Sequence, residues 1–197
     1  MPWLEPISLR GPHARLEPLS QDHCQGLTEA VKDGELWKLW YTFIPRAEDM
    51  GKEIDRRLGL QAAGSMMPWT VFDADGKIAG MTTYMNVDAA NRRVEIGSTW
   101  YARRVQRSAV NTQCKLLLLT HAFEKLDCIA VEFRTHFFNH ASRRGIERLG
   151  AKLDGILRSH QLASNGTLRD TVVYSIIAAE WPTVKAHLNY QLNEKAR

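Results

Sequence analysis

The sequence predicts a single domain of mixed α/β class, spanning residues 1–197, on three observations. The 197 residues are 44% hydrophobic and 24% charged, which is close to the average for globular domains. Segments with apolar side chains at three- and four-residue spacing alternate with short β-rich segments. Two tight-turn signals, Asp75-Gly76 and Ser164-Asn165-Gly166, lie between β-rich segments and predict antiparallel hairpins.

The first third of the chain predicts two short strands and two helices. The strands are expected over 7–9 and 14–19, on either side of a Gly11-Pro12 turn. The first helix is expected over 23–32, with Ser20 as its N-cap. After an aromatic segment, a second helix is expected over 48–63.

The middle of the chain predicts a meander of three strands and then a helical crossover. The strands are expected over 68–73, 77–85 and 92–100. A helix over 111–126 follows, because its leucines recur at three- and four-residue spacing. The next strand, over 130–135, should be the parallel neighbour of the strand over 92–100, since a helix connects the two.

The last third predicts a helix, a hairpin and a final helix. The helix over 139–149 ends at Gly150, a residue favoured just past a helix end. Strands are expected over 151–162 and 168–178, and a C-terminal helix over about 179–193.

Charge and composition exclude several classes of function. The 26 Lys and Arg residues outnumber the 22 Asp and Glu residues only slightly, and they are scattered. Without a basic stripe interleaved with aromatics, nucleic acid is not expected as a substrate. No apolar run approaches the roughly 20 residues that span a bilayer, and the N-terminus shows no secretory pattern, so no membrane and a cytoplasmic address are expected.

Three cysteines, Cys24, Cys114 and Cys128, are odd in number and lack C-x-x-C spacing. This argues against a disulfide framework and a zinc site and favours buried thiols. None of the three has a neighbouring base in the sequence, which argues against a covalent mechanism, although the place of Cys114 near a predicted helix N-terminus could lower its thiol pKa. His136 and His140 are four residues apart, but they straddle a strand end without a third ligand, so no metal is expected.

The junction between Trp100 and Thr112 is the most informative stretch. A strand ends, a loop with Arg103, Arg104 and Arg107 follows, and a long helix begins at about Asn111. Free amides and the helix dipole predict a cradle for a pyrophosphate there, although the arginines could equally form a solvated loop face. Neither an NTP P-loop nor a Rossmann glycine fingerprint occurs.

Three segments carry a resemblance to a known family: VEIGSTWYARRVQRSAVNTQCKLLLLTHAFEKLDC, VEFRTHFFNHASRRGIERLGAKLDGILR and GTLRDTVVYSI. The layout over about 7–182 resembles the GCN5-related N-acetyltransferases (GNAT superfamily), in particular the branch of ribosomal-protein N-terminal acetyltransferases. The resemblance implies the GNAT fold, a mixed, mostly antiparallel twisted sheet of about seven strands flanked by helices. It also implies acetyl-CoA as the cofactor.

The same resemblance implies a set of residues that bind the cofactor. The family's pyrophosphate loop, Gln/Arg-x-x-Gly-x-Gly/Ala, matches the six residues from Gln106, with non-glycine residues at both glycine positions. Asn139 would bond the pantetheine amide, Ser142 would reprotonate the thiol, and Arg144 would reach the phosphates. Helix capping by Asn139 and a solvated Arg144 are the alternative interpretations. The full set is Trp100, Gln106, Arg107, Ser108, Ala109, Val110, Asn111, Thr112, Asn139, Ser142 and Arg144.

A general base must remove a proton from an ammonium before the amine can attack a thioester. Glu95 is the first candidate, because it lies inside a strand where burial raises a carboxyl pKa. The alternative is a structural ion pair with Arg93 or Arg134. Weaker candidates for the base are Asp170, Tyr174, His136 and His140.

An aromatic cluster, Trp37, Trp40, Tyr41 and Phe43, lies between the first two predicted helices. By resemblance this connection forms a wall of the acceptor pocket, while a place in the core or at a subunit interface is the alternative. The predicted function is direct acetyl transfer to a primary amine, first a protein or peptide N-terminus. The alternatives are a small-molecule amine, a non-catalytic coenzyme-A-binding module and an RNA-associated protein. A homodimer or higher homo-oligomer is expected.

Overall fold

The computed structural model describes residues 3–195, and in that part eight strands form one sheet in the order β1-β2-β3-β4-β5-β6-β8-β7. The strands are β1 (Leu9–Arg10), β2 (Ala14–Pro18), β3 (Met66–Asp73), β4 (Ile78–Asp88), β5 (Arg93–Tyr101), β6 (Ala130–His136), β7 (Lys152–Leu162) and β8 (Leu168–Ile177). The α-helices are α1 (Cys24–Lys32), α2 (Met50–Ala62), α3 (Val110–Glu124), α4 (His140–Glu147) and α5 (Trp181–Lys195).

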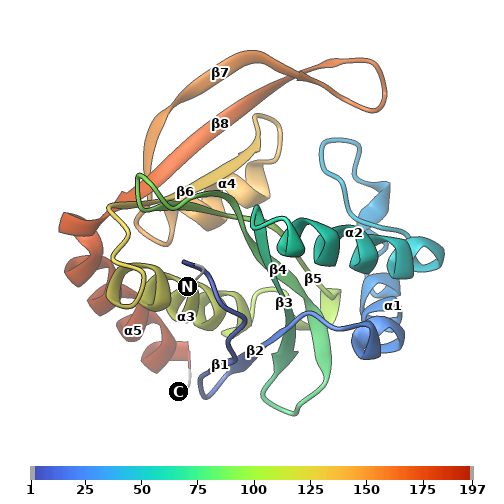
Figure 1. Ribbon diagram of the computed structural model, residues 1–197, viewed down its shortest axis with the longest axis horizontal. Helices are drawn as coiled ribbons and strands as arrows, with labels where there is room; N and C mark the ends of the chain where they lie inside the picture. Colours follow the sequence, from blue (N-terminus) through green and yellow to red (C-terminus); the bar gives the residue numbers. More distant parts are fainter. Residues whose placement is uncertain (1–2, 196–197) are drawn as a thin grey trace.

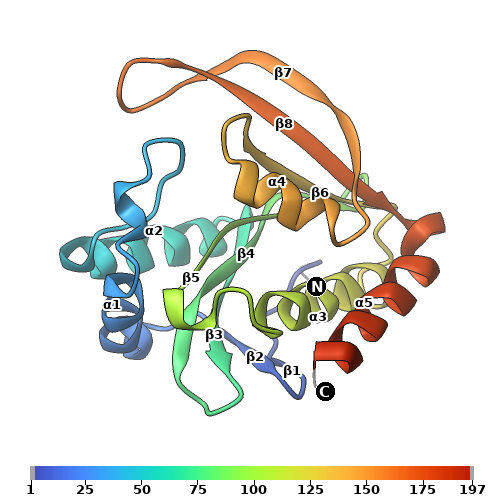
Figure 2. The ribbon, with the colours of Figure 1, turned by 180° about the vertical axis from the view of Figure 1, so that it is seen from behind.

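The helices cover the two faces of the sheet and enclose two hydrophobic cores (Figures 1 and 2). The larger core includes Trp69 and Tyr84 from the sheet together with α3 and α5, which pack side by side. The smaller core lies under α1 and α2 and includes Met81 and Trp100. Within residues 3–195, no helix has the length and apolar character needed to cross a bilayer.

The predicted mixed fold is confirmed, and so are both hairpins and the parallel pairing of β5 with β6. The sheet has the eight strands that the residue pattern predicts, one more than the about seven that the family resemblance implies. The first of them, β1, is only two residues long and pairs with β2. The aromatic segment over 35–45 contains only one turn of 3-10 helix, Leu36–Lys38. The C-terminal helix extends to residue 195, two residues beyond its predicted end.

The central strands β5 and β6 part after three residues. Residues 93–95 pair with residues 130–132, and beyond that point the two strands have no ladder contact, although both continue. The backbone groups of β5 that face β6 past Glu95 therefore have no strand partner. An opening in the middle of the sheet follows.

A bulge in β5 lies at this opening. Thr83 of β4 is opposite Gly97 and Met81 is opposite Trp100, so one residue of β4 faces both Ser98 and Thr99. Ser98 has a φ of 46°, in the left-handed region. An extra residue of this kind bends a strand and increases its twist, which carries β5 away from β6.

A buried ion pair on α2 holds the bulge. Arg57 Nε donates to Glu53 Oε1 at 2.7 Å, while its Nη1 donates to Thr83 Oγ1 at 2.7 Å and its Nη2 to the Ser98 carbonyl oxygen at 3.2 Å. Burial alone would raise the pKa of Glu53, but hydrogen bonds from Arg56 and Arg57 outweigh it and lower that pKa. Helix α2 is thus joined to β4 and β5 through one guanidinium.

Replacing the buried arginine should destabilise the fold far more than replacing its exposed neighbour. Arg57→Ala removes the buried cation beside Glu53 and the donor to Thr83 Oγ1 and the Ser98 carbonyl oxygen. We therefore expect the free energy of unfolding to fall by about 3 kcal/mol. Arg56, whose side chain is 47% exposed and which binds the same carboxylate, is the matched control. Arg56→Ala should cost less than about 1 kcal/mol in urea titrations. Equal losses would contradict the anchoring role of Arg57.

Candidate active site

Two cavities lie on the two sides of the opening between β5 and β6. The first, of about 340 Å³, is bounded by β5, α4 and the N-terminal end of α3. The second, of about 260 Å³, is bounded by β5, α2 and the hairpin of β7 and β8. Both cavities are lined by the same six residues at the opening, which are Thr42, Phe43, Ser98, Arg134, Thr135 and Asn139.

The polar end of the first cavity is built from the N-terminus of α3. Gln106, Arg107 and Asn111 line it, and Arg107 has a left-handed φ of 62°. Ser108 Oγ accepts the Val110 N–H at 3.2 Å. Among the described residues, the first-turn amides of Asn111 and Thr112 have no acceptor. Unpaired amides at a helix N-terminus beside an arginine suit an anion such as a pyrophosphate.

The other end of the first cavity is apolar and is closed by α4. Ile96, Phe133 and Ile146 line it, next to Asn139 and Ser142. Asn139 caps the helix, since its Oδ1 accepts the Ser142 N–H at 3.1 Å. The capping interpretation is therefore confirmed. The amide nitrogen of Asn139 and the hydroxyl of Ser142 are left to meet a bound molecule.

Of the predicted cofactor residues, five line the first cavity: Gln106, Arg107, Asn111, Asn139 and Ser142. The side chains of Trp100, Ser108, Ala109, Val110, Thr112 and Arg144 do not. Trp100 packs into the core under α1 and α2, where 3% of it is exposed. The Thr112 hydroxyl accepts a hydrogen bond from Arg148, and Arg144 is exposed on α4. Their roles in cofactor binding stay predictions that no contact here tests.

Lys115 is a lining residue that the sequence analysis missed. It is buried, and its Nζ donates to Thr99 Oγ1 at 3.3 Å. Burial lowers the pKa of Lys115 to about 8. A signal was available, because a lysine here interrupts a helix that is otherwise apolar nearly all round.

The predicted lowering of the Cys114 thiol pKa is wrong. Cys114 is fully buried against Tyr101, and burial raises the pKa of its thiol to about 12. The thiol lies a full turn inside α3, where the dipole no longer compensates for the loss of water. Cys128 is also buried, with a pKa raised to about 12 by burial, whereas Cys24 is partly exposed.

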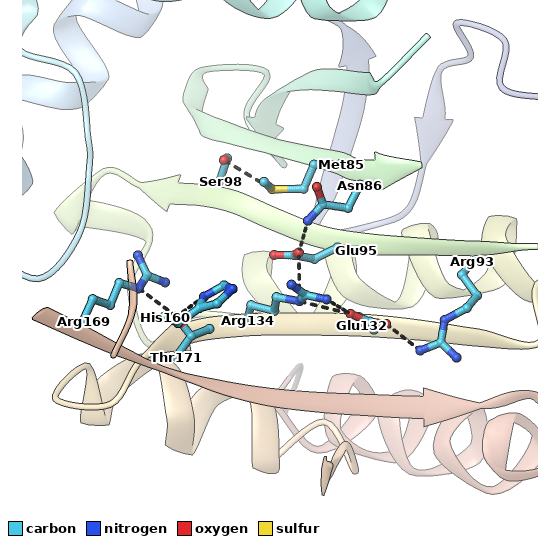
Figure 3. Close-up of polar contacts among 10 residues, drawn as sticks. All are labelled: Met85, Asn86, Arg93, Glu95, Ser98, Glu132, Arg134, His160, Arg169 and Thr171. Carbon is cyan, nitrogen blue, oxygen red and sulfur yellow. Dashed lines mark hydrogen bonds and ion pairs between the residues drawn. The ribbon is translucent and has the colours of Figure 1, made fainter. Parts of the chain in front are cut away.

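Glu95 lies in the second cavity, at the point where β5 and β6 separate (Figure 3). Only 4% of the residue is exposed, and burial raises the pKa of its carboxyl group. Asn86 Nδ2 donates to Oε2 at 2.7 Å, and Arg134 Nε lies 3.6 Å from the same oxygen. The ion pair with Arg134 is thus present, while Arg93 pairs with Glu132 instead.

Of the four weaker candidates for the general base, only one lines the second cavity. Asp170 pairs with Arg158 at 2.6 Å, and the buried Tyr174 donates to Glu147 at 2.7 Å. Neither residue lines the cavities, and His140 is exposed. His136 alone among them lines the second cavity. Within residues 3–195, no three His, Cys, Asp or Glu side chains gather as metal ligands would.

The aromatic segment forms a wall of the second cavity and opens into a third. Tyr41 and Phe43 line the second cavity, and the Trp40 ring meets the ring of His136 edge-on at 5.1 Å. Trp37 and Trp40 line the third cavity, of about 430 Å³, which also touches Ser164 at the hairpin tip. Trp37 packs in part against the core under α1 and α2, so the core interpretation holds for this residue.

The sheet thus opens between two parallel strands, with unpaired helix-end amides on one side and a buried carboxylate on the other. Its mixed fold matches that of a solved structure provisionally described as an acetyltransferase, with a TM-score of 0.85 and 31% identity over 96% of both chains. The family model described as "Acetyltransferase (GNAT) domain" matches residues 13–152. The chain therefore belongs to the GNAT acetyltransferases, a family that uses acetyl-CoA.

Several known proteins are similar to this chain. YdaF of Bacillus subtilis (strain 168), provisionally named a ribosomal N-acetyltransferase, is 36% identical over 107 residues, which are 54% of this chain and 57% of that protein. The match thus spans little more than half the length of this curated relative. A GCN5-related N-acetyltransferase from Brucella melitensis has a TM-score of 0.86 and 29% identity, covering 97% of this chain and 87% of that one.

A complex of the ribosomal L7/L12 α-N-protein acetyltransferase RimL with coenzyme A shares the fold. Its TM-score is 0.74 at 19% identity, over 87% of this chain and 98% of that one. The chemistry of the first cavity fits coenzyme A, since one end offers Arg107 and unpaired helix amides and the other end is apolar and carries Asn139 and Ser142.

Removing the cation at the helix end should weaken cofactor binding. Arg107→Ala should raise the Kd for coenzyme A about tenfold, because a charge-assisted contact contributes about 1.5 kcal/mol. Arg103→Ala, in the same loop but outside the cavity, is the control for net charge and should leave the Kd within about twofold. Isothermal titration with coenzyme A measures both constants. An unchanged Kd for Arg107→Ala would place the phosphates elsewhere.

Proposed function

We propose that this protein transfers the acetyl group of acetyl-CoA directly to a primary amine, with the N-terminal amine of a protein or peptide as acceptor. The observation that carries the proposal is the pairing of the two cavities across one opening. A cavity lined by Arg107 and the N-terminus of α3 lies on one side, the buried Glu95 lies on the other, and six residues line both cavities.

The first cavity would hold the cofactor along its length. The first-turn amides of α3 and Arg107 would bind the pyrophosphate, and the side-chain amide of Asn139 would bond the pantetheine. Ser142, one turn further along α4, would lie near the sulfur and return a proton to it. When bound, acetyl-CoA supplies an acyl group activated as a thioester.

Glu95 would act as the general base toward the acceptor. Its carboxylate is buried, and the raised pKa brings it closer to the pH at which a base must work. Asn86 and Arg134 fix one oxygen, Oε2, which leaves Oε1 for the amine or for a water between them. Burial against cationic side chains also favours the neutral, reactive form of the amine.

A groove leading away from Glu95 supports a peptide as acceptor. The second and third cavities share Thr42, Phe43, Glu53 and Arg56, so they form one continuous surface. Aromatic side chains border it, and Trp40 and Phe43 are 51% and 77% exposed. A peptide would place residues beyond its first one against these rings, which a small amine would not reach. A cytoplasmic address and a homo-oligomeric state stay predictions.

The pH dependence of turnover tests the role of Glu95. Because its pKa is raised and the carboxylate is the active form, kcat/KM should increase with pH through a value above the ordinary range of a glutamate. Glu95→Gln should lower kcat by about 10²-fold, as expected for loss of a general base, and should abolish this dependence. The affinity for coenzyme A should stay unchanged.

Asp170→Asn is the matched control, since it also neutralises one carboxylate but outside the cavities. It should retain both the rate and the pH profile. If Asp170→Asn loses activity and Glu95→Gln does not, the base has been assigned to the wrong carboxylate.

The acceptor class is tested by turnover with matched amines. A library of N-terminal tetrapeptides should be acetylated with a kcat/KM at least tenfold above that of single amino-acid amides with the same first residue. Mass spectrometry of the products locates the acetyl group on the α-amine. Equal rates for peptide and single residue would favour a small-molecule acceptor instead.

A further inference from the structure

The second cavity contains more cationic groups than its own carboxylates can pair. Arg56, Arg57, Arg134 and Arg169 line it together with only Glu53 and Glu95. Glu53 is bound by two of these arginines, and Arg134 also pairs with Glu132 of its own strand, β6, at 2.9 Å. Arg169 is the one that remains.

Arg169 is partly buried and faces Glu95 across the cavity (Figure 3). Its Nε donates to Thr171 Oγ1 at 3.2 Å, on the same strand. Among the described residues, its two terminal nitrogens have no acceptor, and no carboxylate lies within 4.0 Å of them. Burial lowers the pKa of Arg169, although the charge of Glu95 opposes this effect. The terminal nitrogens are therefore free to donate to an anion that enters the cavity.

His136 contributes a second unpaired donor to the same cavity. Only 4% of the residue is exposed, and its Nδ1 accepts the Phe138 N–H at 3.1 Å. A neutral ring therefore carries its hydrogen on Nε2, and Nε2 is buried without a partner in the described part of the chain. Burial and the nearby Arg169 lower the pKa of His136, which keeps the ring neutral and the N–H available.

The position of the His136 ring is fixed by its neighbours. Trp40 meets it edge-on at 5.1 Å, and the ring of Phe138 lies 5.8 Å away. The Nε2–H group of His136 is thus held in one position, as a group that recognises a ligand must be. An unpaired guanidinium and an unpaired N–H are together the donors that a carboxylate requires.

We infer that the second cavity selects an acceptor with a carboxylate close to its amine, and that Arg169 and His136 bind this carboxylate. The inference rests on the proposed function, because it places the amine at Glu95. Two kinds of molecule have a carboxylate close to a primary amine: a peptide with an acidic first residue, and a free amino acid with its α-carboxylate.

Binding measurements test the preference for a carboxylate, and identify its source, independently of turnover. Calorimetric titrations with the protein saturated by coenzyme A, which has no acetyl group to transfer, compare four probes in two pairs. One pair is a tetrapeptide amide that begins with aspartate and the same peptide that begins with asparagine. The other pair is leucine and leucinamide. In at least one pair, the probe with the carboxylate should bind about tenfold more tightly, and that pair identifies the source.

Variants assign the preference to the two residues. Arg169→Gln should remove the tenfold preference by weakening only the probe with the carboxylate. His136→Phe, which keeps the ring against Trp40, should weaken that probe by about threefold. Arg158→Gln, on the neighbouring strand with its side chain 80% exposed, is the control and should keep the preference.

Equal affinities within both pairs, or equal weakening of both members of a pair in Arg169→Gln, overturn the inference. Acetyl transfer to the same probes, measured with acetyl-CoA, tests the proposed function separately. A binding preference without transfer to any amine would refute the acetyltransferase proposal and leave the carboxylate site standing. Acetyl transfer to both members of each pair at equal rates, without a binding preference, would support the acetyltransferase proposal and refute the carboxylate site.

Discussion

The site depends on the separation of two parallel strands in the middle of a continuous sheet. Strands β5 and β6 are joined for three residues and then diverge, so backbone groups that a sheet would normally pair are left for other partners. The left-handed conformation of Ser98 and the extra residue at the bulge turn β5 away. Without this divergence the two cavities would be separated by an intact ladder.

The separation is maintained by groups outside the two strands. Arg57 of α2 binds the Ser98 carbonyl from one face, and α4, capped by Asn139, closes the opening from the other. On the far side of β5, Gly80 of β4 approaches so closely that a Cβ there would lie 2.0 Å from the Trp100 carbonyl oxygen. Only glycine permits that contact. The bulge is therefore held between a buried ion pair and a neighbouring strand that cannot move closer.

Local patterns in the sequence predicted most of the elements, while contacts between distant segments needed the structure. The turn at Asp75-Gly76 and the cap at Asn139 each depend on a few consecutive residues, and both lie where the sequence placed them. The burial of Glu95 was predicted from its place inside a strand. No local signal, however, places Arg169 and His136 in the same cavity, because they meet only when β8 pairs with β6. The lowered pKa predicted for Cys114 failed for a related reason, since distance from the helix end is visible in a sequence and depth in the core is not.

The cleft is divided between two sets of chain segments. The first cavity is made by β5, α3 and α4, elements fixed in the larger core. The third is lined by α2 together with two peripheral segments, the irregular segment over 39–46 and the tip of the β7–β8 hairpin at Ser164. Those two segments carry few core side chains, so substitutions or length changes in them are inexpensive in stability. The part of the site proposed to bind acetyl-CoA can therefore stay the same among related proteins, while the part proposed to bind the amine acceptor varies. Exchanging the two segments between homologues is the natural way to redirect such an enzyme.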